Sequence, residues 1–279
     1  MWNELNTVVV FPNAKINLGL RVVGRRDDSF HNIETVFYPV GWCDILEVIE
    51  NDSIAEKKID FTVSGNALLN SEDNLCVRAF RLLENDFKIP PAKAWLHKII
   101  PAGAGLGGGS SDAVNMILLL NKLFSLKISN EKIKEYALQL GSDCPFFLSD
   151  KPMYATGRGE VMEEIPEVLK NFFIFIVKPK FSISTAEAYR LVKPNKPQST
   201  LKDLIQLPVQ QWKNSIVNDF AIPLGEKFPE INSIKNKFYD AGAVFSLMSG
   251  SGSAVYGIFE KETEGGKIFP GYESWSGRL

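Results

Sequence analysis

A dense run of glycines offers the clearest chemistry in this chain. From Pro101 to Asp112 the sequence reads PAGAGLGGGSSD, which places five glycines within seven residues. Glycines let successive backbone N–H groups point into one concavity, and the positive end of a following helix adds to the attraction for an anion. We therefore expect this loop to bind phosphate through its backbone. The plain alternative is a flexible linker.

The residues after the glycines argue against a free linker. Residues 113–124 read AVNMILLLNKLF, a pattern apolar almost all round and typical of a buried helix, for which Ser110 or Ser111 is a suitable N-cap. A P-loop would need a lysine after the glycines, and none is there. Residues 103–108 match G-x-G-x-x-G but lack the surrounding dinucleotide-binding pattern, and the protein-kinase motifs are absent. The sequence predicts a phosphate loop of another type.

Two polar side chains lie close together on a predicted strand. Lys15 and Asn17 stand two residues apart in the alternating stretch 8–23, so they project from the same side about 7 Å apart. A lysine on a solvent-facing strand is the plain alternative. Asp143 is a further candidate. It lies just after the helix stop at Gly141 and two residues before Pro145, and an aspartate in such a position commonly forms an Asx-turn or an N-cap.

Three further features have plain structural interpretations beside functional ones. His31 is one of two histidines and would ordinarily be a structural hydrogen-bonding residue. Thr185 is most simply part of the cap of a helix over 184–192. Residues 249–253 (SGSGS) could form a simple hairpin turn, although small residues also permit close backbone approach to a ligand.

Hydrophobic periodicity predicts the elements that must position these residues. Strands are expected at 8–23, 31–40, 44–50, 57–63, 93–99, 172–178, 244–248 and 254–259. Helices are expected at 75–87 after Asn74, at 113–124, at 131–140 before Gly141, at 184–192, and at 231–240 before Gly242. The mixed order of strands and helices favours an α+β fold over a doubly wound sheet.

Composition limits the possible partners and environment. The chain of 279 residues is 45% hydrophobic and 23% charged with a net charge of −2, and its basic residues are interleaved with acidic ones, so no nucleic-acid partner is expected. The start resembles no signal peptide, and no apolar run is long enough to cross a membrane. Three distant cysteines argue against a disulfide framework or a zinc site. We expect a cytoplasmic protein.

Four segments together resemble the motifs of the GHMP small-molecule kinases. They are residues 12–18 (PNAKINL), 101–112, 141–147 (GSDCPFF) and 248–253 (MSGSGS), and the resemblance covers nearly the whole chain. Arg25-Arg26-x-Asp28-x-Phe30-His31 and residues 141–146 further resemble the branch that acts in non-mevalonate isoprenoid synthesis. The resemblance implies ATP-dependent phosphorylation of the tertiary 2-hydroxyl of 4-diphosphocytidyl-2-C-methyl-D-erythritol. Kinases of this superfamily that act on homoserine or mevalonate are the runner-up, followed by a non-catalytic nucleotide-binding protein.

The resemblance also implies an architecture and cofactors. The expected fold is α+β with an N-terminal domain like ribosomal protein S5 over residues 1–160 and a ferredoxin-like C-terminal domain over 161–279. The active site would occupy the cleft between these domains. ATP and Mg²⁺ are the expected cofactors, with Ser110 or Ser111 as candidate metal ligands and no other protein ligand assigned. The oligomeric state, monomer or homodimer, is left open.

Individual roles follow from the same resemblance. Asp143 would take the proton of the substrate hydroxyl, and Lys15 would keep Asp143 ionised and stabilise the developing charge. Asn17 and Thr185 would contact the substrate, Phe30 would stack on the cytosine ring and His31 would hydrogen-bond its polar edge. The ATP phosphates would be held by Pro101, Ala102, Gly103, Ala104, Gly105, Leu106, Gly107, Gly108, Gly109, Ser110 and Ser111. The family usually has glycine and tyrosine where this chain has Ser29 and Phe30, so the stacking surface is kept and a hydroxyl is lost.

Overall fold

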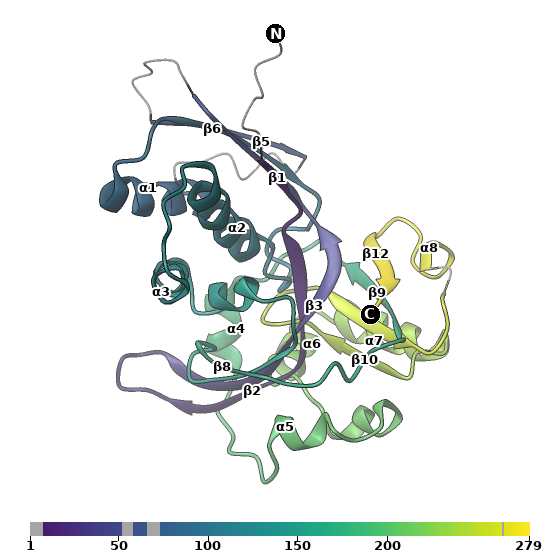
Figure 1. Ribbon diagram of the computed structural model, residues 1–279. Helices are drawn as coiled ribbons and strands as arrows, with labels where there is room; N and C mark the ends of the chain where they lie inside the picture. The colour runs from purple at the N-terminus through teal and green to yellow at the C-terminus, as the bar shows by residue number, and fades with distance from the viewer. Residues whose placement is uncertain (1–7, 52–57, 66–72, 264) are drawn as a thin grey trace. The chain divides into compact units, whose positions relative to one another are not determined.

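Three four-stranded sheets and the helices packed on them make up the part of the chain that the computed structural model describes, residues 8–51, 58–65, 73–263 and 265–279 (Figure 1). The chain divides into two units, each built from separate stretches of sequence. Unit 1 contains residues 1–14, 43–100 and 107–149, and unit 2 contains residues 15–42, 101–106 and 150–279. The glycine run is therefore shared, since residues 101–106 belong to unit 2 and the following glycines to unit 1.

Unit 1 is a sheet with helices on one face (Figure 1). The strand order is β1 (Val8–Val10), β4 (Ile45–Glu50), β6 (Ala92–Lys98), β5 (Ile59–Gly65), antiparallel except for the parallel β5–β6 pair. The helices are α1 (Leu75–Phe87), α2 (Gly108–Leu123) and α3 (Asn130–Leu140), followed by a 3₁₀ turn at Cys144–Leu148. Alternation along β6 buries Ala94 and Leu96 and exposes Trp95, as expected for a sheet covered on one face.

Unit 2 holds the other two sheets. In the first, the order is β2 (Asn13–Arg25), β3 (His31–Cys43), β7 (Met153–Thr156), β8 (Val161–Glu164). In the second, the order is β10 (Phe245–Met248), β11 (Val255–Phe259), β9 (Phe173–Lys178), β12 (Glu273–Arg278), antiparallel throughout. Its helical segments are α4 (Thr185–Leu191), α5 (Leu201–Leu204), a 3₁₀ turn at Val209–Asn214, α6 (Ala221–Lys227), α7 (Glu230–Asp240) and α8 (Gly265–Ile268).

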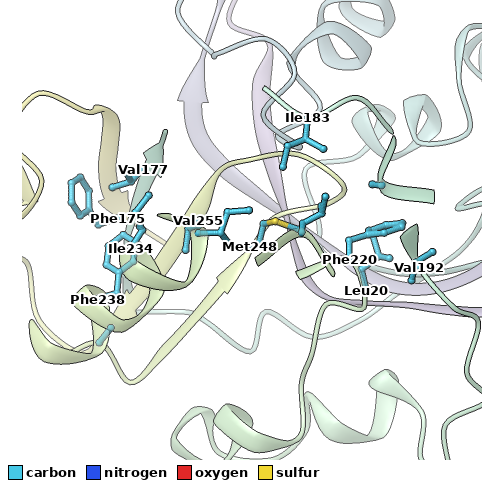
Figure 2. Packing of buried hydrophobic residues seen from close by; sticks show 14 of the residues in the cluster. Leu20, Phe175, Val177, Ile183, Val192, Phe220, Ile234, Phe238, Met248 and Val255 are labelled. Carbon is cyan, nitrogen blue, oxygen red and sulfur yellow. The ribbon is translucent and has the colours of Figure 1, made fainter. Parts of the chain in front are cut away.

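The core of unit 2 anchors both ends of the 249–253 turn. Figure 2 shows Met248, the last residue of β10, and Val255, the first of β11, among the side chains of a larger cluster. Phe238 of α7 packs edge-on against Phe175 of β9 in the same cluster. Because a fully buried side chain of this size contributes roughly 1.5–3 kcal/mol, the two strand ends are held firmly in place.

Most predicted elements are present, and the α+β class is confirmed. The helix over 75–87 has the predicted bounds, and Asn74 caps it by accepting a hydrogen bond from the Cys76 N–H at 2.9 Å. The helices predicted at 131–140 and 231–240 begin one residue earlier. The strand predicted at 57–63 is β5, although residue 57 lies outside the described residues. The domain division between residues 160 and 161 stays a prediction.

Two predictions about elements were wrong, and three strands were missed. The single strand over 8–23 is two strands, because Pro12 has no N–H for a ladder and the chain breaks at residues 11–12. Neither Ser110 nor Ser111 caps the glycine-loop helix, because Gly107 takes the left-handed N-cap position and the helix starts at Gly108. Strands β7, β8 and β12 were not predicted.

No helix among the described residues is long and apolar enough to cross a membrane.

Candidate active site

The glycine loop alternates between left-handed glycines and buried apolar residues. Gly103, Gly105 and Gly107 have φ values of 62°, 76° and 71°, which side chains other than glycine rarely allow. Ala104 and Leu106 between them are each 1% exposed. This alternation directs the apolar side chains into the protein and leaves the backbone free to form an anion-binding concavity.

The last glycines of the run, which belong to unit 1, form the N-cap and the first turn of α2. Gly107 accepts a hydrogen bond from the Ser111 N–H at 2.9 Å, which closes the first helical turn. The N–H groups of the preceding helical residues have no partner within the helix, and they mark its positive end. A Cβ on Gly108 would lie 2.9 Å from Ile100 Cγ2, so the helix start sits directly against the end of β6. This geometry favours phosphate binding.

Asp143 lies beside this first turn. Ser110 Oγ donates a hydrogen bond to Asp143 Oδ1 at 3.1 Å, although 33 residues separate the two in sequence. Asp143 occupies the N-cap position of the 3₁₀ turn at Cys144–Leu148, as the plain alternative predicted, but its side chain makes no capping hydrogen bond there. The carboxylate is thus held by the glycine-loop helix.

A buried ionic cluster lies beneath the same helix turn. Lys98 Nζ donates to Asp44 Oδ2 and, at 2.6 Å, to Asp112 Oδ2, and all three residues are buried. Asp44 Oδ1 also accepts from the N–H groups of Ile99 and Ile100 at 2.6 and 2.8 Å. Burial raises the pKa of Asp112 to about 7, since the Asp44 charge adds to desolvation and Lys98 offsets it only in part. The cluster ties the start of α2 to β6.

Lys15 is held against the glycine loop within unit 2. Its Nζ donates to Asn17 Oδ1 at 2.7 Å and to the Gly105 carbonyl at 3.1 Å, and it lies 5.1 Å from the centre of the Phe37 ring. The backbone N–H of Lys15 donates to the Leu106 carbonyl at 2.9 Å. Lys15 is 5% exposed, so the interpretation as a solvent-facing strand lysine was wrong.

Asn17 is held in place by hydrogen bonds of its side chain and its backbone. Besides accepting from Lys15, its Nδ2 donates to Thr35 Oγ1 at 2.8 Å. Its backbone N–H donates to Ser249 Oγ at 3.2 Å, and its carbonyl accepts from Tyr256 Oη at 2.8 Å. Asn17 therefore orients Lys15, and its contact with substrate stays a prediction.

The 249–253 turn consists of small residues, and its backbone lies directly against the backbone of the glycine loop. Ser249 Oγ donates to the Gly105 carbonyl at 2.9 Å. A Cβ on Gly105 would lie 2.1 Å from the Ser249 carbonyl oxygen, and a Cβ on Gly252 would lie 2.1 Å from the Gly105 nitrogen. Both positions require glycine on steric grounds.

The predicted cytosine-binding residues lie at the start of β3. Phe30 is 53% exposed, with the Arg158 guanidinium 5.0 Å from its ring centre. His31 stacks on Tyr189 of α4 with ring centres 4.9 Å apart. Ser29 adopts a φ of 67°, the left-handed conformation that the usual glycine would favour, so the turn keeps its shape.

Thr185 is the first residue of α4, and Ser184 is the cap, accepting from the Glu187 N–H at 3.2 Å. The Thr185 hydroxyl accepts a hydrogen bond from Ser251 Oγ at 3.1 Å, so the 249–253 turn reaches α4 as well as the glycine loop. Thr185 is exposed, and its contact with substrate stays a prediction.

Oxygen donors at the first turn of α2 fit a magnesium–nucleotide complex. Ser111 Oγ and Asp112 Oδ1 are buried with no hydrogen-bond partner. Within the described ranges, no group of three or more His, Cys, Asp or Glu side chains could hold a metal ion. Mg²⁺ that arrives with nucleotide phosphates needs only one or two protein oxygens, which suits such a site.

Several residues of the site were missed by sequence reasoning. Lys98 carried a usable signal, because it stands on the apolar, helix-covered face of β6, where a charge must be paired. No signal in the sequence pointed to Tyr189, Thr35 or Tyr256, because their partners come from distant segments.

Known proteins resemble this chain along nearly its whole length. Residues 74–151 match the family model "GHMP kinases N terminal domain" and residues 202–270 match "GHMP kinases C terminal". The chain is 45% identical over 257 residues to 4-diphosphocytidyl-2-C-methyl-D-erythritol kinase of Bacteroides fragilis, covering 91% of this chain and 93% of the relative. It is 42% identical to the protein of the same name from Parabacteroides distasonis, covering 98% and 100%. A crystal structure of 4-(cytidine 5'-diphospho)-2C-methyl-D-erythritol kinase superposes with a TM-score of 0.81 at 29% identity, covering 96% and 98%.

The fold and the glycine-loop site define a small-molecule kinase of the GHMP class. Sequence identity above 40% to two relatives, over more than nine-tenths of the chain, places it in one branch of this class. The chain belongs to the GHMP kinases and, within them, to the 4-diphosphocytidyl-2-C-methyl-D-erythritol kinase family.

Proposed function

We propose that the protein transfers the γ-phosphoryl group of ATP to the 2-hydroxyl of 4-diphosphocytidyl-2-C-methyl-D-erythritol, yielding the 2-phosphate and ADP. The substrate follows from the relatives that share 42–45% of its sequence. In this reaction a bond forms between the substrate oxygen and the γ-phosphorus. The bond from the γ-phosphorus to the bridging oxygen breaks, and ADP leaves with the electron pair.

The observation that carries the catalytic assignment is the hydrogen bond between Ser110 and Asp143. It holds a carboxylate at the positive start of the glycine-loop helix, where phosphate is expected to bind. Asp143 is assigned as the acceptor of the hydroxyl proton. A tertiary alcohol is a poor nucleophile near neutral pH, so a positioned base contributes roughly 10²–10⁴-fold to the rate.

Lys15 is assigned to the negative charge that develops during transfer. Its ammonium group donates to Asn17 Oδ1 and to the Gly105 carbonyl within unit 2, which fixes its position. The group is buried, where the dielectric constant is low and a charge acts strongly on its neighbours. Pre-positioned charge of this kind stabilises a phosphoryl-transfer transition state without reorganisation.

Residues 101–111 are assigned to the ATP phosphates, and Ser110 or Ser111 to the accompanying Mg²⁺. The unpartnered Ser111 Oγ supports this assignment, because a buried hydroxyl ordinarily has a partner. When bound, the ion would neutralise phosphate charge. Phe30 and His31 are assigned to the cytosine ring, with the exposed Phe30 face available for stacking.

An assay of ADP release tests this function. The wild-type protein should phosphorylate the cytidine-containing substrate in preference to homoserine or mevalonate. Asp143→Asn should lower kcat about 10²–10⁴-fold at unchanged thermal stability, because the amide keeps the shape and cannot accept the proton. Asp150→Asn, at an exposed position, is the matched control and should retain activity.

Three results would contradict parts of the proposal. Preference for an alcohol without cytosine would refute the substrate. Full activity of Asp143→Asn would refute the base. Tight ATP binding without phosphoryl transfer to any alcohol would favour a nucleotide-binding protein that does not catalyse transfer.

A further inference from the structure

Asn218 is a buried amide in a segment that pairs with the strand carrying Lys15. The Leu20 N–H of β2 donates to the Val217 carbonyl at 2.9 Å, and the Asp219 N–H donates back to the Leu20 carbonyl at 2.8 Å. Asp219 Oδ2 also accepts from the Val22 N–H at 2.8 Å. These bonds fix residues 217–219 alongside β2, and Asn218 between them is 1% exposed.

The Asn218 side chain directs both of its donors to the 249–253 turn. Its Nδ2 donates to the carbonyls of Met248 and Gly250, each at 2.8 Å, and its Oδ1 accepts from the Phe220 N–H at 3.0 Å. An amide nitrogen has two hydrogens, so neither is left for a ligand. Gly250 has a φ of 57°, one of several conformations open to a glycine, and the amide stabilises this one through the two carbonyls.

The turn held by Asn218 is in direct backbone contact with the glycine loop. The Ala254 N–H donates to the Ala104 carbonyl at 3.1 Å, and Ser249 Oγ donates to the Gly105 carbonyl. That Gly105 carbonyl is also the acceptor for Lys15 Nζ. Because the two backbones are in van der Waals contact at Gly105 and Gly252, the turn cannot shift without displacing the loop.

We propose that Asn218 is a positioning residue for phosphoryl transfer, which sets the conformation of the glycine loop and of Lys15 through the 249–253 turn. It touches neither the predicted phosphate-binding backbone nor Lys15 directly. The inference deepens the proposed function and rests on it. It adds a segment outside the four sequence motifs to the machinery of the reaction.

Asn218→Ala tests the proposal, with Asp219→Ala as its matched control. Both variants remove side-chain hydrogen bonds from the same segment, but only Asn218 bonds to the turn. Asn218→Ala should lower kcat/KM for ATP by roughly 10- to 100-fold, because misplacement by about 1 Å has effects of this size. Its KM for the alcohol substrate should change less than about threefold. Asp219→Ala should lose thermal stability and keep kcat/KM for ATP close to wild type.

Amide hydrogen exchange of the ligand-free protein supplies a readout that needs no turnover. Peptides covering Lys15 and Ala254, whose N–H groups bond to the loop, should exchange faster in Asn218→Ala than in Asp219→Ala. Asn218→Ser, with a smaller hydroxyl donor, is the second variant should Asn218→Ala fail to fold, and it should show the same pattern more weakly.

Equal exchange in the two alanine variants, or equal losses of kcat/KM, would overturn the positioning role. Failure of the proposed function gives a different result. In that case the wild-type protein would not phosphorylate the cytidine-containing substrate, while the exchange difference between the variants would persist.

Discussion

At the scale of single residues, the side chains proposed to be functional differ in how the protein restrains them. Lys15 is buried and fixed by two neutral oxygen atoms, whereas Phe30 is half exposed beneath the Arg158 guanidinium. Fixed charge near the reacting atoms is needed in one geometry, since reorganisation would cost free energy during transfer. A ring that stacks on a base needs only an accessible face.

Replacing Phe30 should therefore affect binding of the alcohol substrate and little else. Stacking of a base on an aromatic ring contributes about 1–3 kcal/mol, so Phe30→Ala should raise the KM for the cytidine-containing substrate about 5- to 150-fold. The KM for ATP and the thermal midpoint should stay near wild type, because the ring is 53% exposed. Steady-state kinetics with each substrate varied in turn measures both effects.

Phe11→Ala is the control for loss of an exposed aromatic ring, since Phe11 is 64% exposed and lies outside the proposed site. It should change neither KM. An unchanged KM for the alcohol substrate in Phe30→Ala would show that the ring does not stack on the cytosine.

At the scale of elements, the conformation of the glycine loop depends on its own glycines and on two other segments. The glycine loop supplies left-handed residues, the 249–253 turn fits against it backbone to backbone, and residues 217–219 hold that turn. Each turn follows or precedes a regular element whose side chains are buried. The conformation of the loop around Gly105 is consequently restrained by backbone contacts with the 249–253 turn.

Gly105→Ala should disrupt this arrangement more than a substitution that strains the backbone alone. The new Cβ would require a φ of 76° and would lie 2.1 Å from the Ser249 carbonyl oxygen, which is backbone and cannot rotate away. Left-handed conformation by itself costs an alanine roughly 1–2 kcal/mol. We expect a larger loss of stability than this and an increase of at least about tenfold in the KM for ATP.

Gly242→Ala isolates the strain, because Gly242 has a φ of 92° with no atom within 4 Å of an added Cβ. It should lose about 1–2 kcal/mol and keep the KM for ATP. Thermal unfolding and steady-state kinetics compare the two variants, and equal behaviour would contradict the steric account of Gly105.

At the scale of the whole molecule, the chain builds each unit from separate segments. Unit 1 takes three stretches of sequence and unit 2 takes another three, so the chain passes from one to the other repeatedly, including within the glycine run. Within unit 1, the buried Lys98 cluster connects separate segments of the chain. Asp44 precedes β4, Lys98 is the last residue of β6, and Asp112 lies in α2. This cluster should dominate the response of unit 1 to charge substitution.

Lys98→Met should destabilise the protein by about 3–5 kcal/mol, because it leaves two buried carboxylates without their cation. Adding Asp112→Asn should restore part of the loss, since it removes one of the unpaired charges. Urea denaturation followed by circular dichroism measures both variants. Lys93→Met, on the same strand but outside the cluster, should change stability by less than about 0.5 kcal/mol. Equal stability of Lys98→Met and wild type would refute the role of the cluster.

The class of fold and most element positions could be predicted from the sequence alone, and the sequence also indicates a phosphate loop. These follow from local properties: periodicity defines α1 and α3, and glycines at alternate positions define a loop whose backbone is accessible. Lys15, Asn17 and Asp143 were proposed as site residues from motifs in the sequence, and their roles stay predictions. Asn74 was found because a cap acts on the helix that follows it immediately.

Which distant groups support that loop could not be predicted from the sequence and is seen in the folded protein. Lys98 with Asp44, Ser110 with Asp143, and Asn218 with Gly250 are separated by 54, 33 and 32 residues. No local pattern encodes such pairs, because burial creates the need for a partner and the path of the chain supplies it. The glycines mark the predicted phosphate site, whereas the shape of that site depends on contacts that form only when the chain has folded.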